Sequence, residues 1–363
     1  MMRVVLVDDE APARARLAAL LAEAGGVTVV GDAENADDAR AVIARVSPDV
    51  VFLDIEMPAE RGTELAASLP EPRPFVVFAT AYERFAVDAF QYDPADYLLK
   101  PVNRQRLAQT LDRLRVKLAA RRDTEREWTA AARAQAHLLP RSLPEVPGYA
   151  MAARTLPARA VGGDFYDATL VEDRLAFVLG DVAGKGMAAG LIASSVQARW
   201  QAAMRQRDLT AAEMMTALNR DVLASTEGSR YATLVHALLD PPTGAVRYVN
   251  AGHPAPLVVD RDGAVVPLEV TAPAVGLLDA PAFADAAHVL APGDTLVVVS
   301  DGVTEARDTA GIDWDLAHIP ALVTRHAGDC EALAEAIVAA VRDHRGTDQT
   351  QDDVTVFVLR RTA

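Results

Sequence analysis

The run Asp49–Pro58, DVVFLDIEMP, places a short apolar stretch directly before an acidic residue, Asp54. Further apolar runs share this part of the chain, at residues 4–7, 27–30, 75–79 and 96–99. Their hydrophobicity is continuous, which is typical of strands buried on both faces of a parallel sheet. Helical patterns such as Ala13–Ala24 separate the runs. Together they predict a doubly wound α/β domain with a five-stranded parallel sheet.

Polar residues follow the expected carboxyl ends of these strands. Asp8 and Asp9 follow the first run, and Asp54 follows the third. Thr80 and Lys100 follow the fourth and fifth. Parallel strands deliver such residues to one crevice, where clustered carboxylates suit Mg²⁺. Asp54 can then act as a nucleophile toward phosphorus, and Thr80 and Lys100 would bind the added oxygens.

The motifs VDDE, FLDIEMP, ATAY and DYLLKP in this region resemble the signature set of response-regulator receiver domains. The resemblance implies that Asp54 is a phosphoacceptor loaded by a sensor histidine kinase, and that the Lys100–Pro101 bond is cis. It also implies a Mg²⁺ site made of Asp8, Asp9, Asp54 and the backbone carbonyl of Glu56, with Thr80, Tyr97 and Lys100 as the switch residues.

Composition excludes several other classes of protein. The 36 basic and 51 acidic side chains give a net charge of −15, and a field of that sign opposes nucleic-acid binding. The single cysteine, Cys330, allows neither an internal disulfide nor a thiolate metal site. No apolar run approaches the ~20 residues needed to span a bilayer. We therefore expect a cytoplasmic protein with no nucleic-acid or membrane partner.

The segment after residue 103 contains neither Pro nor Gly up to residue 137, which predicts one helix. We expect a first domain over residues 1–103, a helical linker over 104–140 and a second domain over 141–363. Two interpretations of the linker stay open: a helix that docks onto its own domain, or a coiled coil that makes the protein a homodimer. Both use a seam of leucines, Leu107, Leu111, Leu114 and Leu118.

After residue 140, strand-like segments closed by turn residues predict an α+β domain of mostly antiparallel sheets. Four separated segments, GGDFYD, GDVAGKG, VVVSDG and QDDVTVF, each place Asp beside Gly or at a strand end. Any one of them is a turn, but together they supply the carboxylates of a two-metal site. A water shared by two divalent ions ionises near neutral pH and can attack phosphorus.

The motifs GGDFYD, GDVAGKGMAAG, YVNAGHPAP, VSDGVTEA and DDVTVFVL resemble the SpoIIE-like branch of the metal-dependent protein phosphatases, the protein phosphatase 2C family. The resemblance implies an α-β-β-α sandwich that binds two Mn²⁺ or Mg²⁺ ions. The implied ligands are Asp164, a bridging Asp181, the backbone carbonyl of Val182, Asp301 and Asp352, with Asp352 and not Asp353 aligned to the ligand position. Arg159 is a candidate substrate contact, and Lys185 either contacts substrate phosphate or caps its loop.

Both resemblances together imply a response regulator whose Asp54 phosphorylation controls a phosphoserine and phosphothreonine protein phosphatase. The implied substrate is a phosphorylated anti-sigma-factor antagonist of the STAS class in a partner-switching pathway. The alternative is a phosphorylation-gated adaptor that binds the same partner without catalysis. Whether phosphorylation activates or inhibits stays open. We hypothesise that it changes receiver pairing and stiffens residues 104–139.

Overall fold

The computed structural model describes residues 1–81, 94–158, 160–205, 209–226, 228–346 and 352–363. The chain divides into two compact units, Met1–Arg126 and Glu127–Ala363. Within the described ranges, no helix has the length and apolar character that a membrane span requires.

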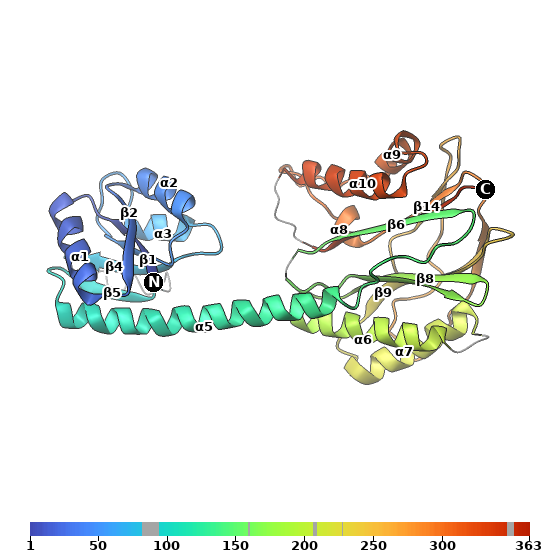
Figure 1. Ribbon diagram of the computed structural model, residues 1–363, viewed down its shortest axis with the longest axis horizontal. Helices are drawn as coiled ribbons and strands as arrows, with labels where there is room; N and C mark the ends of the chain where they lie inside the picture. The colour runs from blue at the N-terminus through green and yellow to red at the C-terminus, as the bar shows by residue number, and fades with distance from the viewer. Residues whose placement is uncertain (82–93, 159, 206–208, 227, 347–351) are drawn as a thin grey trace. The chain divides into compact units, whose positions relative to one another are not determined.

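The first unit is a parallel sheet in the order β2-β1-β3-β4-β5, with helices on both faces (Figure 1). The predicted doubly wound fold is confirmed. The Lys100–Pro101 bond is cis, as the resemblance implied. The elements of this unit are β1 (Met2–Val7), α1 (Ala11–Ala24), β2 (Val27–Ala33), α2 (Ala36–Val46), β3 (Val50–Leu53), α3 (Gly62–Ser68), β4 (Phe75–Thr80), β5 (Asp96–Leu99) and the first part of α5 (Arg104–Ala136).

Two apolar clusters fill the space between the sheet and its helices. One joins α1 and α5 to one face, and the other joins α2 and α3 to the opposite face. The strands are apolar on both faces because each face is covered, which is why their hydrophobicity does not alternate.

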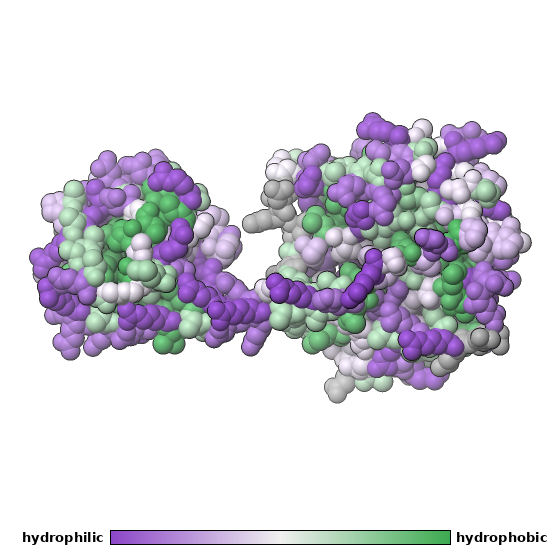
Figure 2. Space-filling model, viewed as in Figure 1, coloured by the Kyte–Doolittle hydropathy of each residue, from purple (hydrophilic) through white to green (hydrophobic). Residues whose placement is uncertain are grey.

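Helix α5 uses its leucine seam inside the first unit. Leu107, Leu111, Leu114 and Leu118 are all buried in the cluster that α5 shares with the sheet. The spacing therefore serves to dock the helix onto its own domain over these residues. Beyond the seam, residues 122–127 are all exposed, and hydrophilic side chains cover this stretch (Figure 2).

The second unit contains two five-stranded antiparallel sheets, in the orders β13-β10-β9-β8-β7 and β12-β11-β14-β15-β6. The strands are β6 (Tyr149–Leu156), β7 (Phe165–Val171), β8 (Arg174–Val182), β9 (Ala232–Asp240), β10 (Ala245–Ala251), β11 (Leu257–Val259), β12 (Val265–Pro267), β13 (Ala286–Val289), β14 (Thr295–Val299) and β15 (Val354–Arg361). The helices are α6 (Met187–Met204), α7 (Ala211–Thr226), α8 (Asp301–Thr304), the 3₁₀ turn η2 (Leu316–His318), α9 (Ile319–Arg325) and α10 (Cys330–Arg345).

The two sheets pack face to face, and helices cover both outer faces (Figure 1). Between the sheets, Phe177 of β8 stacks on Phe357 of β15 with ring centroids 5.1 Å apart. Alternate residues of β15, such as Val356, point instead to the layer of α8, α9 and α10. Helices α6 and α7 cover the other sheet, with Trp200 fully buried. The predicted α-β-β-α sandwich is confirmed.

Candidate functional site

The edge of the parallel sheet where its strands end holds a cluster of carboxylates. Asp8 and Asp54 are buried at 7% exposure each, whereas Asp9 is exposed. One oxygen from each of these three aspartates lies within 4.8 Å of the others. The backbone N–H of Asp54 donates to the carbonyl of Val7 at 2.8 Å, which fixes the end of β3 beside the end of β1. Such a set of oxygens suits Mg²⁺.

Lys100 joins this cluster from the end of β5. Its Nζ lies 2.5 Å from Oδ2 of Asp54 and 2.7 Å from Oδ2 of Asp8. Burial raises the pKa of Asp54, and Lys100 opposes that rise. Burial alone would lower the pKa of Lys100, but the two carboxylates raise it overall. The ammonium group therefore stays charged where an added phosphoryl group would need a cation.

Thr80 and the remaining receiver residues lie around the same edge. The hydroxyl oxygen of Thr80 is buried and has no hydrogen-bond partner among the described residues. A phosphoryl oxygen on Asp54 would give it one. Glu56 is exposed, and its backbone N–H donates to Oδ1 of Asp54 at 3.3 Å. Tyr97 in β5 is half-buried.

The second unit brings four aspartates to one edge of its sandwich. Asp164 directly precedes β7 and Asp181 lies near the end of β8, and these two strands pair. Asp301 follows β14 and Asp352 precedes β15, which also pair. Each sheet therefore supplies two carboxylates. The charges of Asp301 and Asp352 raise the pKa of Asp181, so the two pairs lie close enough to repel one another.

Mutual repulsion and burial shape the ionisation of this group. Burial, and then the charge of Asp181, raises the pKa of Asp164 well above its usual value. Burial, and then Asp301 and Asp352, raises the pKa of Asp181 to about 7. Burial and Asp352 raise the pKa of Asp301 to about 6. Carboxylates that raise one another's pKa by repulsion are stabilised in their charged form when a cation binds between them.

The donors of this edge fit divalent metal ions. Both oxygens of Asp164 are buried and make no hydrogen bond of normal geometry with the described part of the chain, although Ser300 and Thr355 lie near enough to lower its pKa against the effect of burial. A buried carboxylate without partners is costly unless a cation pairs with it. Among the described residues, no three of these carboxylates place oxygens within 4.8 Å of one another. What favours a cation here is the burial of Asp164 among other carboxylates.

Asp353, the neighbour of Asp352, has a different task. Its Oδ1 accepts the N–H of Ala158 and its Oδ2 accepts the N–H of Gly163, each at 2.7 Å. It is buried, so these charge-assisted bonds are strong. Asp353 thus anchors the loop that carries Asp164. The motif resemblance aligned Asp352 and not Asp353 with the ligand position, and two adjacent aspartates in a sequence do not reveal this anchoring role.

Two glycines allow the backbone to approach these carboxylates. A Cβ at Gly163 would lie 2.7 Å from Oδ1 of Asp181 and 2.8 Å from the carbonyl oxygen of Val182. A Cβ at Gly302 would lie 1.8 Å from the carbonyl oxygen of Asp353. Neither position has room for a side chain. Val182 itself is fully buried, and its N–H donates to the carbonyl of Gly163 at 3.3 Å.

The basic residues near the site have mixed placements. Lys185 lies beside the acidic edge, with its Nζ 2.8 Å from Oδ2 of Asp352. Arg154 instead pairs with Glu331 and Glu335 of α10. Arg159 lies outside the described residues.

Two polar residues from the same motifs have structural partners. Asp167 accepts from Gln197 at 3.1 Å and from Gln201 at 2.6 Å, both on α6. The Nδ1 atom of buried His253 lies 3.0 Å from the hydroxyl of Thr233, and the backbone N–H of His253 donates to Oδ1 of Asn250. Both residues therefore order local structure.

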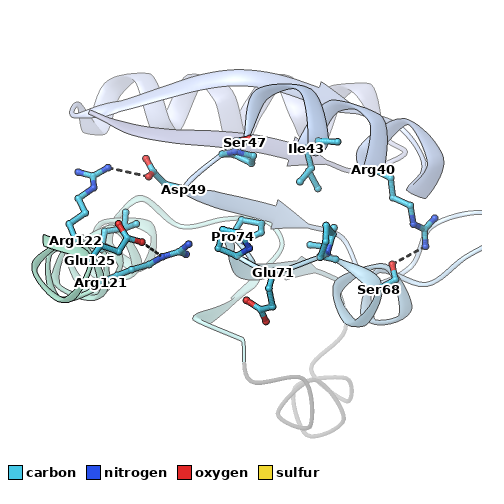
Figure 3. Close-up of a pocket in the computed structure, with 16 residues that line it drawn as sticks. Arg40, Ile43, Ser47, Asp49, Ser68, Glu71, Pro74, Arg121, Arg122 and Glu125 are labelled. Atoms are coloured by element: carbon cyan, nitrogen blue, oxygen red, sulfur yellow. Dashed lines mark hydrogen bonds and ion pairs between the residues drawn. The ribbon is translucent and has the colours of Figure 1, made fainter. Parts of the chain in front are cut away.

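A pocket of about 540 Å³ lies in the first unit, away from the Asp54 cluster (Figure 3). It opens beside the residues that precede β3 and β4, the opposite ends of those strands from Asp54 and Thr80. Ion pairs border it, including Arg122 with Asp49 at 3.1 Å and Arg121 with Glu125 at 3.1 Å. It holds none of the residues predicted for phosphoryl chemistry.

A parallel-sheet domain with an acidic edge, followed by a two-sheet sandwich with a second acidic edge, defines a receiver domain joined to a phosphatase-type domain. Comparison with known families agrees. The response regulator receiver domain matches residues 4–112, and Stage II sporulation protein E (SpoIIE) matches residues 171–362. The second match spans more than half of the chain, so this protein belongs to the SpoIIE family.

Relatives with curated descriptions match the receiver part. An uncharacterized response regulatory protein of Yersinia pestis is 52% identical over 115 residues, which are 31% of this chain and 48% of that protein. The transcriptional regulatory protein BtsR of Escherichia coli is 44% identical over 116 residues, 32% of this chain and 48% of BtsR. The chain thus spans about half the length of these relatives.

Solved structures match the phosphatase part. The RsbU and RsbW domains of a Mycobacterium tuberculosis protein share 29% identity with a TM-score of 0.53, covering 62% of this chain and 63% of that one. The protein phosphatase 2C domain of SiaA from Pseudomonas aeruginosa shares 22% identity with a TM-score of 0.57, covering 67% and 98%. The phosphatase domain of SpoIIE from Bacillus subtilis shares 18% identity with a TM-score of 0.53, covering 60% and 64%. The last two similarities establish the fold alone.

Proposed function

We propose that this protein is a response regulator in which phosphorylation of Asp54 controls a Mn²⁺- or Mg²⁺-dependent phosphoserine and phosphothreonine phosphatase. One observation carries the catalytic half of the proposal. Four aspartates from both sheets of the sandwich lie close enough to raise one another's pKa, and the buried carboxylate of Asp164 makes no hydrogen bond of normal geometry with the described residues. An adaptor that only binds its partner has no need of such a costly arrangement.

Asp164, Asp181, Asp301, Asp352 and the carbonyl of Val182 would hold two divalent ions. Bound there, these ions supply an acidified water and neutralise phosphoryl oxygens. The chain's own contribution is placement. Asp353 holds the Asp164 loop by accepting the backbone N–H groups of Ala158 and Gly163. Because Gly163 has no side chain, the loop can lie against Asp181.

Lys185 is the described cation best placed for a substrate phosphate. Its ammonium group lies 2.8 Å from Oδ2 of Asp352, one of the four aspartates of the acidic edge. A phosphoprotein approaching a chain of net charge −15 needs a local positive group to offset the repulsion. We propose that Lys185, together with Arg159, supplies it.

The receiver half of the proposal rests on the Asp54 cluster. A sensor histidine kinase would transfer its phosphoryl group to Asp54, with Mg²⁺ held by Asp8, Asp9, Asp54 and the carbonyl of Glu56. Thr80 and Lys100 would then bind the new oxygens, and Tyr97 would respond as the switch aromatic. The buried, unpartnered hydroxyl of Thr80 supports this assignment.

We propose a phosphorylated STAS-type anti-sigma-factor antagonist as the substrate. The motif resemblance to SpoIIE-like phosphatases supports this class, as does the similarity to an RsbU domain. The pathway would then be a partner switch, in which dephosphorylation changes which protein the antagonist binds.

The deciding experiment is Mn²⁺-dependent release of phosphate from a phosphoserine STAS protein of the same organism, with and without beryllofluoride on Asp54. Asp164→Asn is the control. Turnover that changes with beryllofluoride, in either direction, supports the proposal and gives the sign of regulation. If the parent and Asp164→Asn both leave a verified substrate phosphorylated, the adaptor interpretation replaces it.

A further inference from the structure

The side chain of Gln135, in the last turn of α5, pairs with the backbone of Gly162. Its Nε2 donates to the carbonyl of Gly162 at 2.7 Å, and its Oε1 accepts the N–H of Gly162 at 3.1 Å. A primary amide carries the same donor and acceptor as a peptide group, so one side chain satisfies both polar groups of one residue. Such a two-point contact fixes orientation as well as distance.

Gly162 lies two residues before Asp164, so the contact acts on the loop that carries a proposed metal ligand. From the other side, Asp353 binds the N–H groups of Ala158 and Gly163 in the same loop. A Cβ at Gly162 would lie 2.1 Å from Oδ2 of Asp353, so this position admits no side chain. At Gly162 the contacts are therefore made with the backbone, by Gln135 at Gly162 itself and by Asp353 at the neighbouring Gly163.

The end of α5 is itself held in place within the second unit. Gln197 of α6 donates to the carbonyl of Leu138 at 2.9 Å, and Leu139 packs against the cluster under α6 and α7. Gly190 of α6 completes the contact, because a Cβ there would lie 3.1 Å from the carbonyl oxygen of Gly162 and 3.3 Å from Nε2 of Gln135. The amide of Gln135 thus fits a narrow slot between α6 and the loop.

We infer that Gln135 is a positioning residue that holds the Asp164 loop in its metal-binding form, so that the last turn of α5 controls the loop. The amide reaches Gly162 only while residue 135 is helical and in its present phase, since one residue turns a helix by about 100°. Helix α5 begins in the receiver unit. A signal carried along the helix would therefore reach the Asp164 loop through the contact between Gln135 and Gly162. This inference rests on the proposed function for the meaning of the site.

The test compares Gln135→Met and Gln135→Ala with the parent in the full-length protein. Met keeps the length of the side chain but neither hydrogen bond, and Ala keeps the helix. Ala134→Gln is the matched control, because Ala134 is exposed and its neighbour still carries the amide. The readouts are the Mn²⁺ dissociation constant by calorimetry and amide hydrogen exchange of the peptide that contains Gly162 and Gly163.

We expect both Gln135 variants to bind Mn²⁺ about tenfold more weakly, as for other residues that orient metal ligands. Amide exchange in the Gly162 peptide should rise in both, and Ala134→Gln should match the parent in both readouts. Parent-like Mn²⁺ affinity and exchange in the folded Gln135→Ala protein would overturn the inference. If the parent binds Mn²⁺ in a Gln135-dependent way but never hydrolyses phosphoserine, the proposed function fails and the inference stands.

Discussion

The carboxylate of Asp353 accepts the N–H of Gly163 at 2.7 Å across 190 residues of sequence, and so ties the start of β15 to the loop in front of β7. Its neighbour Asp352 instead pairs with Lys185 and raises the pKa values of Asp181 and Asp301. The two adjacent aspartates therefore have different roles. Asp353 binds the backbone, and Asp352 faces the acidic edge.

This division predicts unequal effects of the two substitutions on stability. Asp353→Ala leaves two N–H groups without their charged acceptor, and we expect the free energy of unfolding to fall by about 3 kcal/mol. Asp352→Ala removes a repulsive charge and an exposed ion pair, so the metal-free protein should keep its stability within about 1 kcal/mol. Urea unfolding in the presence of a chelator checks both. Equal losses in the two variants would contradict the assignment.

Lys185 should compete with metal ions for the acidic edge. Its charge offsets Asp352 and lowers the pKa of Asp301 against the effect of burial. Lys185→Met should therefore bind Mn²⁺ severalfold more tightly, whereas Lys185→Arg should match the parent because its charge is kept. A simultaneous rise in KM for a phosphoprotein would assign Lys185 to substrate binding, and an unchanged KM would assign it to the loop. Unaltered Mn²⁺ affinity in Lys185→Met would refute the electrostatic argument.

Buried His236 gives the phosphatase unit a pH dependence. Burial lowers its pKa to about 4 from an ordinary 6.5, with the carbonyl of Phe177 opposing the shift. As the pH falls below 6.5, the unfolded chain binds a proton that the folded chain does not. The free energy of unfolding should therefore fall by about 1.4 kcal/mol per pH unit from this residue, down to about pH 4.

The measurement is urea unfolding at pH 7 and pH 5, followed by tryptophan fluorescence. Between these values the parent should lose about 2 kcal/mol more than His236→Gln. The carboxylates with raised pKa values act with the opposite sign, but they are present in both proteins and cancel in the comparison. His137→Gln, at an exposed position, should behave like the parent. An identical pH response in parent and His236→Gln would show that folding does not lower the pKa of His236.

Helix α5 should carry the signal between Asp54 and the phosphatase. Ala119 is exposed and directly follows Leu118, the last buried leucine of the seam. Ala119→Pro removes a helical hydrogen bond and costs about 3 kcal/mol of helix stability. We expect basal phosphate release to persist while the response to beryllofluoride is lost. Ala119→Ser should keep the response, and a full response in Ala119→Pro would exclude the helix as the carrier.

The strands of the receiver and the residues that follow them could be predicted from the sequence because the signals are local. A buried run such as VVFL ends where Asp54 begins, and the sheet topology then places that residue at the edge. The leucine seam of α5 could not be assigned in the same way. The spacing of Leu107, Leu111 and Leu114 suits a coiled coil and a docked helix equally, and only their burial against the sheet distinguishes the two.

The roles of Asp353 and Gln135 lay beyond the sequence for a different reason. Successive residues of an extended chain point in opposite directions, but the sequence does not show which of the two aspartates before β15 faces the acidic edge. Gln135 lies beyond the leucine seam of α5, and its partner is the backbone of a glycine 27 residues away. A hydrogen bond to a main-chain group leaves no pattern in the sequence, so the contact between Gln135 and Gly162 could not be predicted from it.

The uninterrupted run of α5 from Arg104 to Ala136 also sets a rule for exchanging input domains. Each residue inserted into the exposed stretch 122–127 advances the following helix by about 1.5 Å and turns it by about 100°. Seven residues return to within about 20° of the original phase, whereas two residues turn the helix by about 200°. A chimaera that joins a foreign input domain here should therefore change the length of the helix by whole heptads. Only such changes keep Gln135 at nearly the same rotational position relative to the input domain.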